Sequence, residues 1–262
     1  MSASLRIPLA LVMLSIAALA AALWLGPTQL ANPFASDDIT RTIVWDIRFP
    51  RALTAWLAGA ALGLTGAALQ GLSLVLIGVG LSSFAGGLIA LALNLAPNPG
   101  ALADLVNWTL GSVDGRSLEH VALAATLLGI GAVLIFAAAR GLQALTLGEE
   151  AAVAIGANLT NTRILVVLGA AACTGGATAV AGVIGFVGIA APHLVRALAG
   201  HDPARLLLPS ALAGGALLVC ADITVRLLPT DTELKLGVAA ALIGGPVFAL
   251  IAARLASRGG DS

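Results

Sequence analysis

The feature that most constrains this chain is a run of 44 residues, positions 52–95, without a single charged side chain. A helix crosses about 30 Å of hydrocarbon with about 20 residues, because each residue adds 1.5 Å of length. The run is therefore too long for one crossing and fits two. Its break at Gln70-Gly71-Leu72-Ser73 predicts a very tight turn between two adjacent membrane spans.

The composition of the whole chain supports a lipid environment. Of 262 residues, 59% are apolar and 10% are charged, whereas soluble domains carry about 25% charged residues. Thirteen basic and thirteen acidic side chains are too few to cover a water-facing surface. A soluble enzyme and a disordered chain are excluded on this ground. The zero net charge and the lack of a Lys/Arg run exclude a nucleic-acid-binding protein.

Further apolar runs of similar length predict an all-α polytopic membrane helix bundle of about eight transmembrane helices in one domain, residues 1–262. The additional spans are expected at residues 7–25, 118–139, 164–180, 206–221 and 237–253, with a short span that ends near Arg196. The first run is long for the apolar core of a signal peptide, so a retained anchor is favoured over a cleaved leader. An even number of spans places both termini on one side. With the N-terminus inside, seven arginines would lie on the cytoplasmic side and six basic residues outside. The positive-inside rule therefore does not decide the orientation.

Three arginines near the ends of predicted spans are the first functional candidates. Arg48 and Arg51 stand three residues apart at the start of the second span, and Arg226 ends another span on the same face. Arginines at span ends also serve as simple interfacial anchors. Asp222 lies one helical turn before Arg226, so the two are expected to pair.

The second candidate is the segment 145–160, which is too short and too polar to span a membrane. Gly148, Glu149, Glu150 and Ala151 predict a helix start, because acidic side chains are favoured in a first turn. Gly156 suits a C-terminal cap. The segment is either an inert loop between spans or a rigid helix on which a partner docks.

The third candidate is a glycine-rich stretch that leads into a proline. Gly182, Gly185 and Gly188 permit close approach between helices, and Pro192 is expected to break or kink the span. The neighbouring His193 is more often structural than a proton relay. No intramembrane chain of acidic or lysine residues accompanies it, which counts against a proton-coupled or sodium-coupled pump.

No catalytic, metal or cofactor site is expected from this sequence. Cys173 and Cys220 stand singly in apolar runs and are interpreted as packing residues. The three histidines are scattered, so no zinc-ligand spacing exists. Neither a nucleophile-elbow motif nor a phosphate-binding loop is present, so any nucleotide chemistry must take place on another protein.

At these residues the sequence resembles the FecCD/BtuC-type permease subunits of binding-protein-dependent ABC importers for iron-siderophores, haem and cobalamin. The matching pieces run from about residue 41 to 255, and their order makes the resemblance specific. They are the Arg48-Phe49-Pro50-Arg51 motif, Gly66 to Gly71, Trp108 to Ser112, Leu145 to Ala151 with Ile155-Gly156, Gly182 to Arg196, Asp222 with Arg226, and Gly244-Gly245-Pro246.

The resemblance implies a homodimeric permease in the cell (inner or plasma) membrane with both termini cytoplasmic. It implies that the segment around Glu149 couples to an ATPase subunit, and that Arg48, Arg51 and Arg226 dock an extracytoplasmic substrate-binding protein. Family members look like ten-helix proteins, and this chain lacks the helix pair that should follow Gln70-Gly71. Loss of two spans preserves the sidedness of everything downstream. The alternative is a shortened, transport-inactive remnant that inserts in the membrane without conducting.

Overall fold

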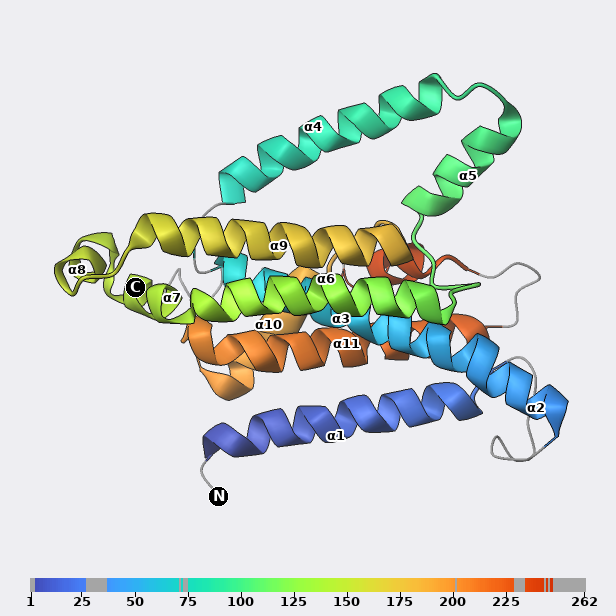
Figure 1. Ribbon diagram of the computed structural model, residues 1–262, viewed down its shortest axis with the longest axis horizontal. Coiled ribbons are helices and arrows are strands. Elements are labelled where there is room, and N and C mark those ends of the chain that lie inside the picture. Colours follow the sequence, from blue (N-terminus) through green and yellow to red (C-terminus); the bar gives the residue numbers. More distant parts are fainter. Residues whose placement is uncertain are drawn as a thin grey trace.

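The computed structural model describes residues 3–26, 37–70, 72, 75–200, 202–228, 234–242, 244 and 246, and these form helices and connecting loops without a strand (Figure 1). The elements in chain order are α1 Ala3–Trp24, α2 Asp38–Thr42, the π-helical turn η1 Ile43–Arg48, α3 Phe49–Gln70, α4 Val75–Asn94, α5 Pro99–Thr109, α6 Leu118–Ala137, α7 Ala139–Ala144, the 3-10 turn η2 Leu145–Leu147, α8 Glu149–Ala154, α9 Leu159–Ala181, α10 Val187–Ala199 and α11 Pro203–Leu227. Residues 236–242 are also helical.

The expected spans coincide with helices in the described residues. Within the part of the chain that the structure describes, five continuous helical stretches are long and apolar enough to cross a membrane: Arg6–Trp24, Asp38–Gln70, Leu118–Ala137, Leu159–Ala181 and Pro203–Leu227. The split of residues 52–95 is confirmed, because α3 ends at Gln70 and α4 begins at Val75. The short span ending near Arg196 corresponds to α10. The last expected span, 237–253, lies largely outside the described residues.

Two helical segments were not expected from the sequence. The second span begins 14 residues earlier than position 52, because Asp37 caps α2 by accepting a hydrogen bond from the Thr40 backbone N–H at 2.9 Å. This hydrogen bond holds the pKa of Asp37 below its ordinary value. α5 starts at Pro99 behind the capping side chain of Asn98. Both starts use a polar N-cap, which a search for apolar runs overlooks.

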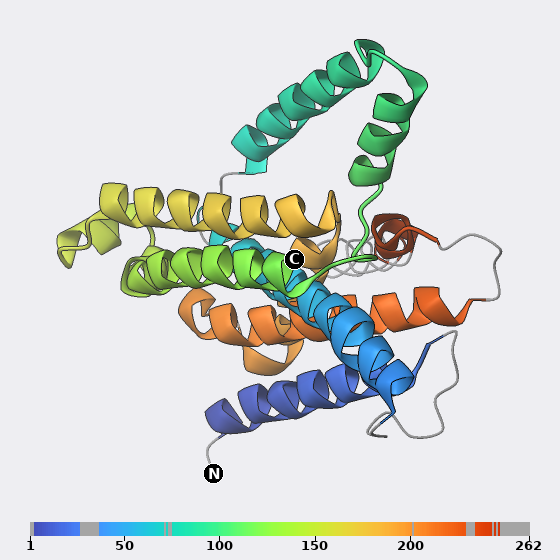
Figure 2. The same ribbon diagram turned by 45° about the vertical axis from the view of Figure 1, so that its right-hand side comes forward.

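The centre of the bundle is α3, which packs against α11, α10, α9 and α6 (Figures 1 and 2). Small residues let the backbones touch. A Cβ atom at Gly59 would overlap the Gly214 carbonyl on α11, and one at Gly66 would overlap the Gly188 carbonyl on α10. Contacts of this kind replace the hydrophobic driving force that helices lack in lipid. The glycines of α3 therefore position α10 and α11.

The helices α4 and α5 stand apart from this bundle as a hairpin in both views (Figures 1 and 2). The described side chains of α4 are almost all exposed, including Phe84 at 65% and Leu91 at 54%. An added Cβ at Gly86 or Gly87 would meet nothing. The hairpin begins at the connection between α3 and α4, where the sequence predicts a missing helix pair.

The contact between α3 and α11 gives a direct prediction. Gly63→Ala should lower the free energy of unfolding by about 1–3 kcal/mol, because its Cβ would overlap the Ser210 carbonyl and overpacking costs that much. Gly129→Ala on α6 is the matched control, since nothing lies near that position. The control should be neutral or stabilising, because alanine favours a helix over glycine. Thermal unfolding of both variants in detergent micelles measures the difference, and equal shifts would contradict the packing.

Candidate functional site

One end of the bundle, here called the arginine end, collects charged side chains from η1, α3, α11 and the loop between α5 and α6, and most of them are buried. Arg51 near the start of α3 lies 2.9 Å from the Asp222 carboxylate on α11. The same guanidinium lies 3.0 Å from Asp114 in the loop between α5 and α6. Asp222 also lies 3.1 Å from Arg226, one turn further along α11. The expected pairing of Asp222 with Arg226 is confirmed, and Asp222 additionally bridges two arginines.

The other arginine contacts reach the C-terminal end of α1. Arg48 donates from Nη1 to the carbonyl oxygens of Leu23 at 2.7 Å and Trp24 at 3.0 Å. Arg226 donates to the Ala22 carbonyl at 3.2 Å. The last carbonyls of a helix lack partners within it and carry the negative end of its dipole. Two arginines therefore cap α1 and join it to η1 and α11.

All three predicted docking arginines are consequently buried within the chain. Arg48 is 4% exposed, Arg51 is 8% exposed and Arg226 is 9% exposed, while Asp222 is fully buried. A buried guanidinium requires the charge partners and hydrogen bonds that are seen here. The sequence contained no sign of the Arg51–Asp114 pair, because 63 positions separate the two residues.

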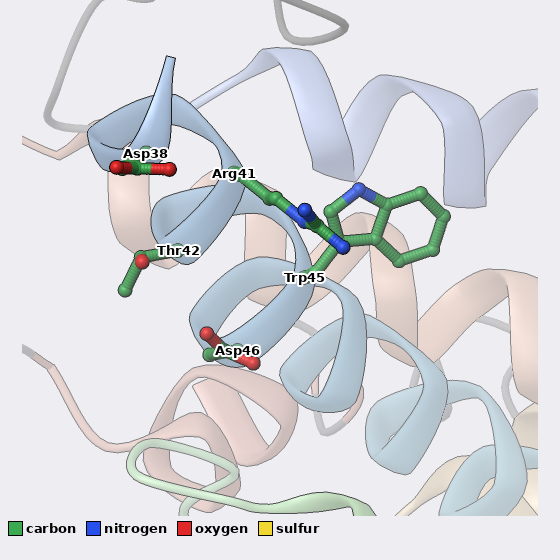
Figure 3. A pocket seen from close by; sticks show the side chains of 5 residues that line it. All are labelled: Asp38, Arg41, Thr42, Trp45 and Asp46. Atoms are coloured by element: carbon green, nitrogen blue, oxygen red, sulfur yellow. The ribbon is translucent and has the colours of Figure 1, made fainter. Parts of the chain in front are cut away.

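The same end of the bundle carries an exposed extension formed by α2 and η1. Its side chains line a shallow hollow of about 430 Å³. Figure 3 shows Asp38, Thr42 and Asp46 along one side and Arg41 reaching toward the indole of Trp45 on the other. The whole stretch Asp38–Gln70 has 33 residues, about 50 Å at 1.5 Å per residue. The stretch is therefore longer than the thickness of about 30 Å of a hydrocarbon layer.

The opposite end carries the predicted coupling segment (Figure 1). The chain passes from α7 through η2 into α8, with left-handed backbone at Gly148 (φ 93°) and Gly156 (φ 84°) on either side of α8. Glu149 and Glu150 occupy the first turn of α8 and are exposed, as is Ala151. Glu149 forms an ion pair with Arg163 on α9. The segment is thus a short exposed helix at the end of the bundle.

Sequence reasoning missed the apolar side chains of this segment. Leu147 is 63% exposed, Val153 is 59% exposed and Ile155 is 64% exposed. They belong to the same short segment as the two glutamates, at the end of the bundle opposite the arginines (Figure 1). Exposed apolar groups in such a place indicate an interaction surface.

The glycine and proline stretch forms the passage from α9 to α10. Gly182 has a left-handed backbone (φ 71°), and a Cβ there would overlap the Trp108 carbonyl; a Cβ at Gly188 would lie 3.2 Å from the Leu62 carbonyl. Gly185 has open space around it. The helix is interrupted before Val187, not at Pro192, which lies inside the continuous helix α10. His193 contacts the Ile189 carbonyl at 2.8 Å.

Two further cavities adjoin these features. A polar cavity of about 310 Å³ opens at the arginine end. Its lining is Asp104, Asn107, Trp108, Ser112, Asp114, Arg116, Gly182 and Lys235. An apolar cavity of about 350 Å³ lies between α10, α11, Ala240 and Gly244. In the part of the chain that the structure describes, no three His, Cys, Asp or Glu side chains are grouped to hold a metal ion.

Long apolar helices with polar ends define a multi-span membrane protein. The comparison with protein families is specific: the FecCD transport family matches residues 8–74 and 71–254. The chain belongs to the FecCD transport family.

The relatives include importer permeases. The uncharacterized ABC transporter permease protein YvrB of Bacillus subtilis is 38% identical over 190 residues, 72% of this chain and 53% of YvrB. The chain thus spans about half the length of YvrB. The cobalamin import permease BtuC of Halobacterium salinarum is 32% identical over 276 residues, 82% of this chain and 74% of that protein. Other relatives are named for siderophore, Fe(3+)-citrate or hemin transport.

A solved structure shares the fold. It is a metal-chelate type ABC transporter in an inward-facing conformation, with a TM-score of 0.79 and 24% identity, and the match covers 95% of this chain and 99% of the other.

The comparisons also locate the shortened region. The two family matches meet at residues 71–74, at the connection between α3 and α4. The alignment with the vitamin B12 import permease BtuC of Yersinia enterocolitica, 28% identical, extends over 313 residues although this chain has 262. That relative therefore carries residues without a counterpart here, which agrees with the predicted loss of an internal helix pair.

Proposed function

We propose that this chain is the membrane-spanning permease subunit of an ABC importer that moves an iron-chelate, haem or cobalamin-like substrate into the cytoplasm. ATP is hydrolysed on a separate subunit, and the permease contributes no catalytic residue. The observation that carries the proposal is the exposed α8 tip at one end of a bundle that belongs to the FecCD family. The substrate classes are those for which the relatives are named.

The ATPase subunit docks on the segment 145–160. Glu149 and Glu150 offer charge at its surface, and Val153 and Ile155 offer apolar area. The short α8 is held between the left-handed residues Gly148 and Gly156 and tied to α9 through Arg163. Because α8 is held rigidly in this way, it transmits movement of the ATPase subunit into the helix bundle.

An extracytoplasmic substrate-binding protein docks at the arginine end. The guanidinium groups proposed to receive its carboxylates are those of Arg48, Arg51 and Arg226, which are buried in the permease alone. Because Arg51 faces the exposed Asp114, this arginine is the point at which an outside carboxylate gains access.

The remaining parts of the proposal concern assembly and orientation. The whole chain, residues 1–262, acts as one transmembrane domain in the cell membrane, and a second copy of the permease completes the pathway. The N-terminal end of α1 lies at the same end of the bundle as α8 (Figure 1). With α8 facing the ATPase, the N-terminus is cytoplasmic, and an even number of spans places the C-terminus there too.

The experiment is uptake into proteoliposomes that hold the permease, its ATPase and its binding protein. Ferric siderophore, ferric citrate, haem and cobalamin are offered in turn, each radiolabelled. We expect ATP-dependent accumulation of one class and none when the ATPase carries an inactivating substitution. An assembled complex that hydrolyses ATP but accumulates none of the four would contradict the proposal and favour the transport-inactive alternative.

A further inference from the structure

Asp114 differs from the other members of the charge network in its access to water. Its side chain is 58% exposed, whereas that of Arg51 is 10% exposed and that of Asp222 is 1% exposed. Arg51 therefore has one carboxylate partner buried in the bundle and another at the surface. The exposed pair contributes less stability than the buried one, because water competes for both of its groups.

The loop that carries Asp114, residues 111–117, is anchored on its other side by backbone contacts. Ser112 N–H donates to the Ala181 carbonyl at the end of α9 at 2.8 Å, and Gly237 N–H donates to the Gly111 carbonyl at 3.3 Å. The Asp114 N–H donates to the Ser112 hydroxyl at 3.1 Å. On the side of α3, the loop is held to the bundle by the contact between Asp114 and Arg51.

The same loop forms part of the wall of the polar cavity at the arginine end. Asp114 and Arg116 line this cavity together with Asp104 of α5 and Lys235. The neighbouring Val113 is 1% exposed. Displacement of the loop from Arg51 would uncover Val113 and widen this cavity.

We propose that Asp114 occupies the position on Arg51 that a carboxylate of the docking protein takes in the complex. An acidic side chain of that protein replaces Asp114 on Arg51 and thereby releases the loop 111–117. This inference rests on the proposed docking of a binding protein at this end. One carboxylate replaces another on the same guanidinium, so the exchange keeps a charge-assisted hydrogen bond on Arg51. Docking is thus coupled to opening of the polar cavity.

Arg51 is the arginine that suits this exchange. Arg48 donates to backbone carbonyls of α1, which do not move away independently of that helix. Arg226 pairs with Asp222, and both side chains are at most 4% exposed. In Arg51, by contrast, one nitrogen faces the buried Asp222 and another faces the surface residue Asp114.

A cysteine reporter tests the release of the loop in the permease alone. Val113→Cys is placed in a chain with Cys173→Ala and Cys220→Ala, reconstituted in lipid nanodiscs, and treated with a membrane-impermeant maleimide. The parent should label slowly, and added Asp114→Asn should label several-fold faster. Glu119→Gln is the matched control, because Glu119 is another exposed acid at this end, in the first turn of α6. It should leave the rate unchanged.

A second arm tests the exchange itself. A blocked peptide containing glutamate should accelerate labelling of the Val113→Cys parent, while its glutamine counterpart should not. Neither peptide should change the rate once Asp114→Asn is present, because the loop is already released.

Native Cys173, fully buried in α9, serves as a reporter of general unfolding when it is the only cysteine. The labelling rate of Cys173 should be the same in the chain with Asp114 and in the chain with Asp114→Asn. Equal slow labelling of Val113→Cys in the Asp114→Asn and Glu119→Gln chains would overturn the proposal, and so would a parallel rise at Cys173 or equal effects of the two peptides. Since no ATPase or binding protein is present, failure of the uptake experiment would leave these results standing.

Discussion

Asp222→Asn is expected to lower the free energy of unfolding by about 3–5 kcal/mol, the usual cost of removing one partner from a buried ion pair. Asp222 lies 2.9 Å from Arg51 and 3.1 Å from Arg226, and its side chain is 1% exposed. Asparagine keeps the shape of the side chain but leaves two buried guanidinium groups without the carboxylate between them. The loss should appear as looser attachment of α11 to α3.

The matched control is Asp46→Asn on η1, which removes an exposed carboxylate from the same end of the bundle. A surface change of this kind stays within about 0.5 kcal/mol of the parent. Unfolding of both variants by denaturant in detergent micelles measures the difference. Similar values for Asp222→Asn and Asp46→Asn would mean that the charge network contributes little to stability.

Burial also changes what charge reversal at the arginine end can test. With Arg51→Glu and Arg226→Glu together, two new carboxylates would face Asp222 at a site that water does not reach. Like charges in such a place are destabilising. Lost docking in that double variant would follow from lost structure, so the single exposed residue Asp114 is the better position for testing docking.

Most of the described spans were predictable in position from the sequence, because lipid imposes a minimum length on every uncharged run. The polar start of the second span, residues 38–51, was not. The split between α3 and α4 and the pair formed by Asp222 and Arg226 were predictable for equally local reasons. A turn needs a break in the apolar pattern, and residues four apart on a helix face each other.

Contacts between distant segments were not predictable in this way. The approach of Asp114 to Arg51, and of Arg48 to the end of α1, depends on how α1, α3 and α11 pack together. The arginines looked like exposed groups because their positions at span ends suit a membrane interface. Contacts with α1 make Arg48 and Arg226 internal, and Arg51 lies between Asp222 and Asp114. The contact between Gly59 and Gly214 was not predictable either, because small residues allow close approach but do not identify the partner helix.

The exposed apolar residues of the coupling segment provide the second large expected effect. Val153→Ser combined with Ile155→Ser should weaken association with the ATPase subunit about 100-fold or more. The two side chains are 59% and 64% exposed, and burial of each aliphatic side chain contributes about 1.5–3 kcal/mol. A combined loss of about 3 kcal/mol already corresponds to a factor of about 100 in Kd. Titration of the purified ATPase against permease in nanodiscs measures that factor.

Ile39→Ser with Ile47→Ser makes the same chemical change at the arginine end, where the two isoleucines are 73% and 53% exposed. This control should bind the ATPase as the parent does. Glu149→Lys with Glu150→Lys should have a smaller and salt-dependent effect, because the pair between Glu149 and Arg163 is exposed and such pairs contribute about 0–1 kcal/mol. If the glutamate reversal weakened binding more than the serine pair, docking at α8 would be electrostatic. Equal binding by the two serine pairs would place the ATPase contact elsewhere.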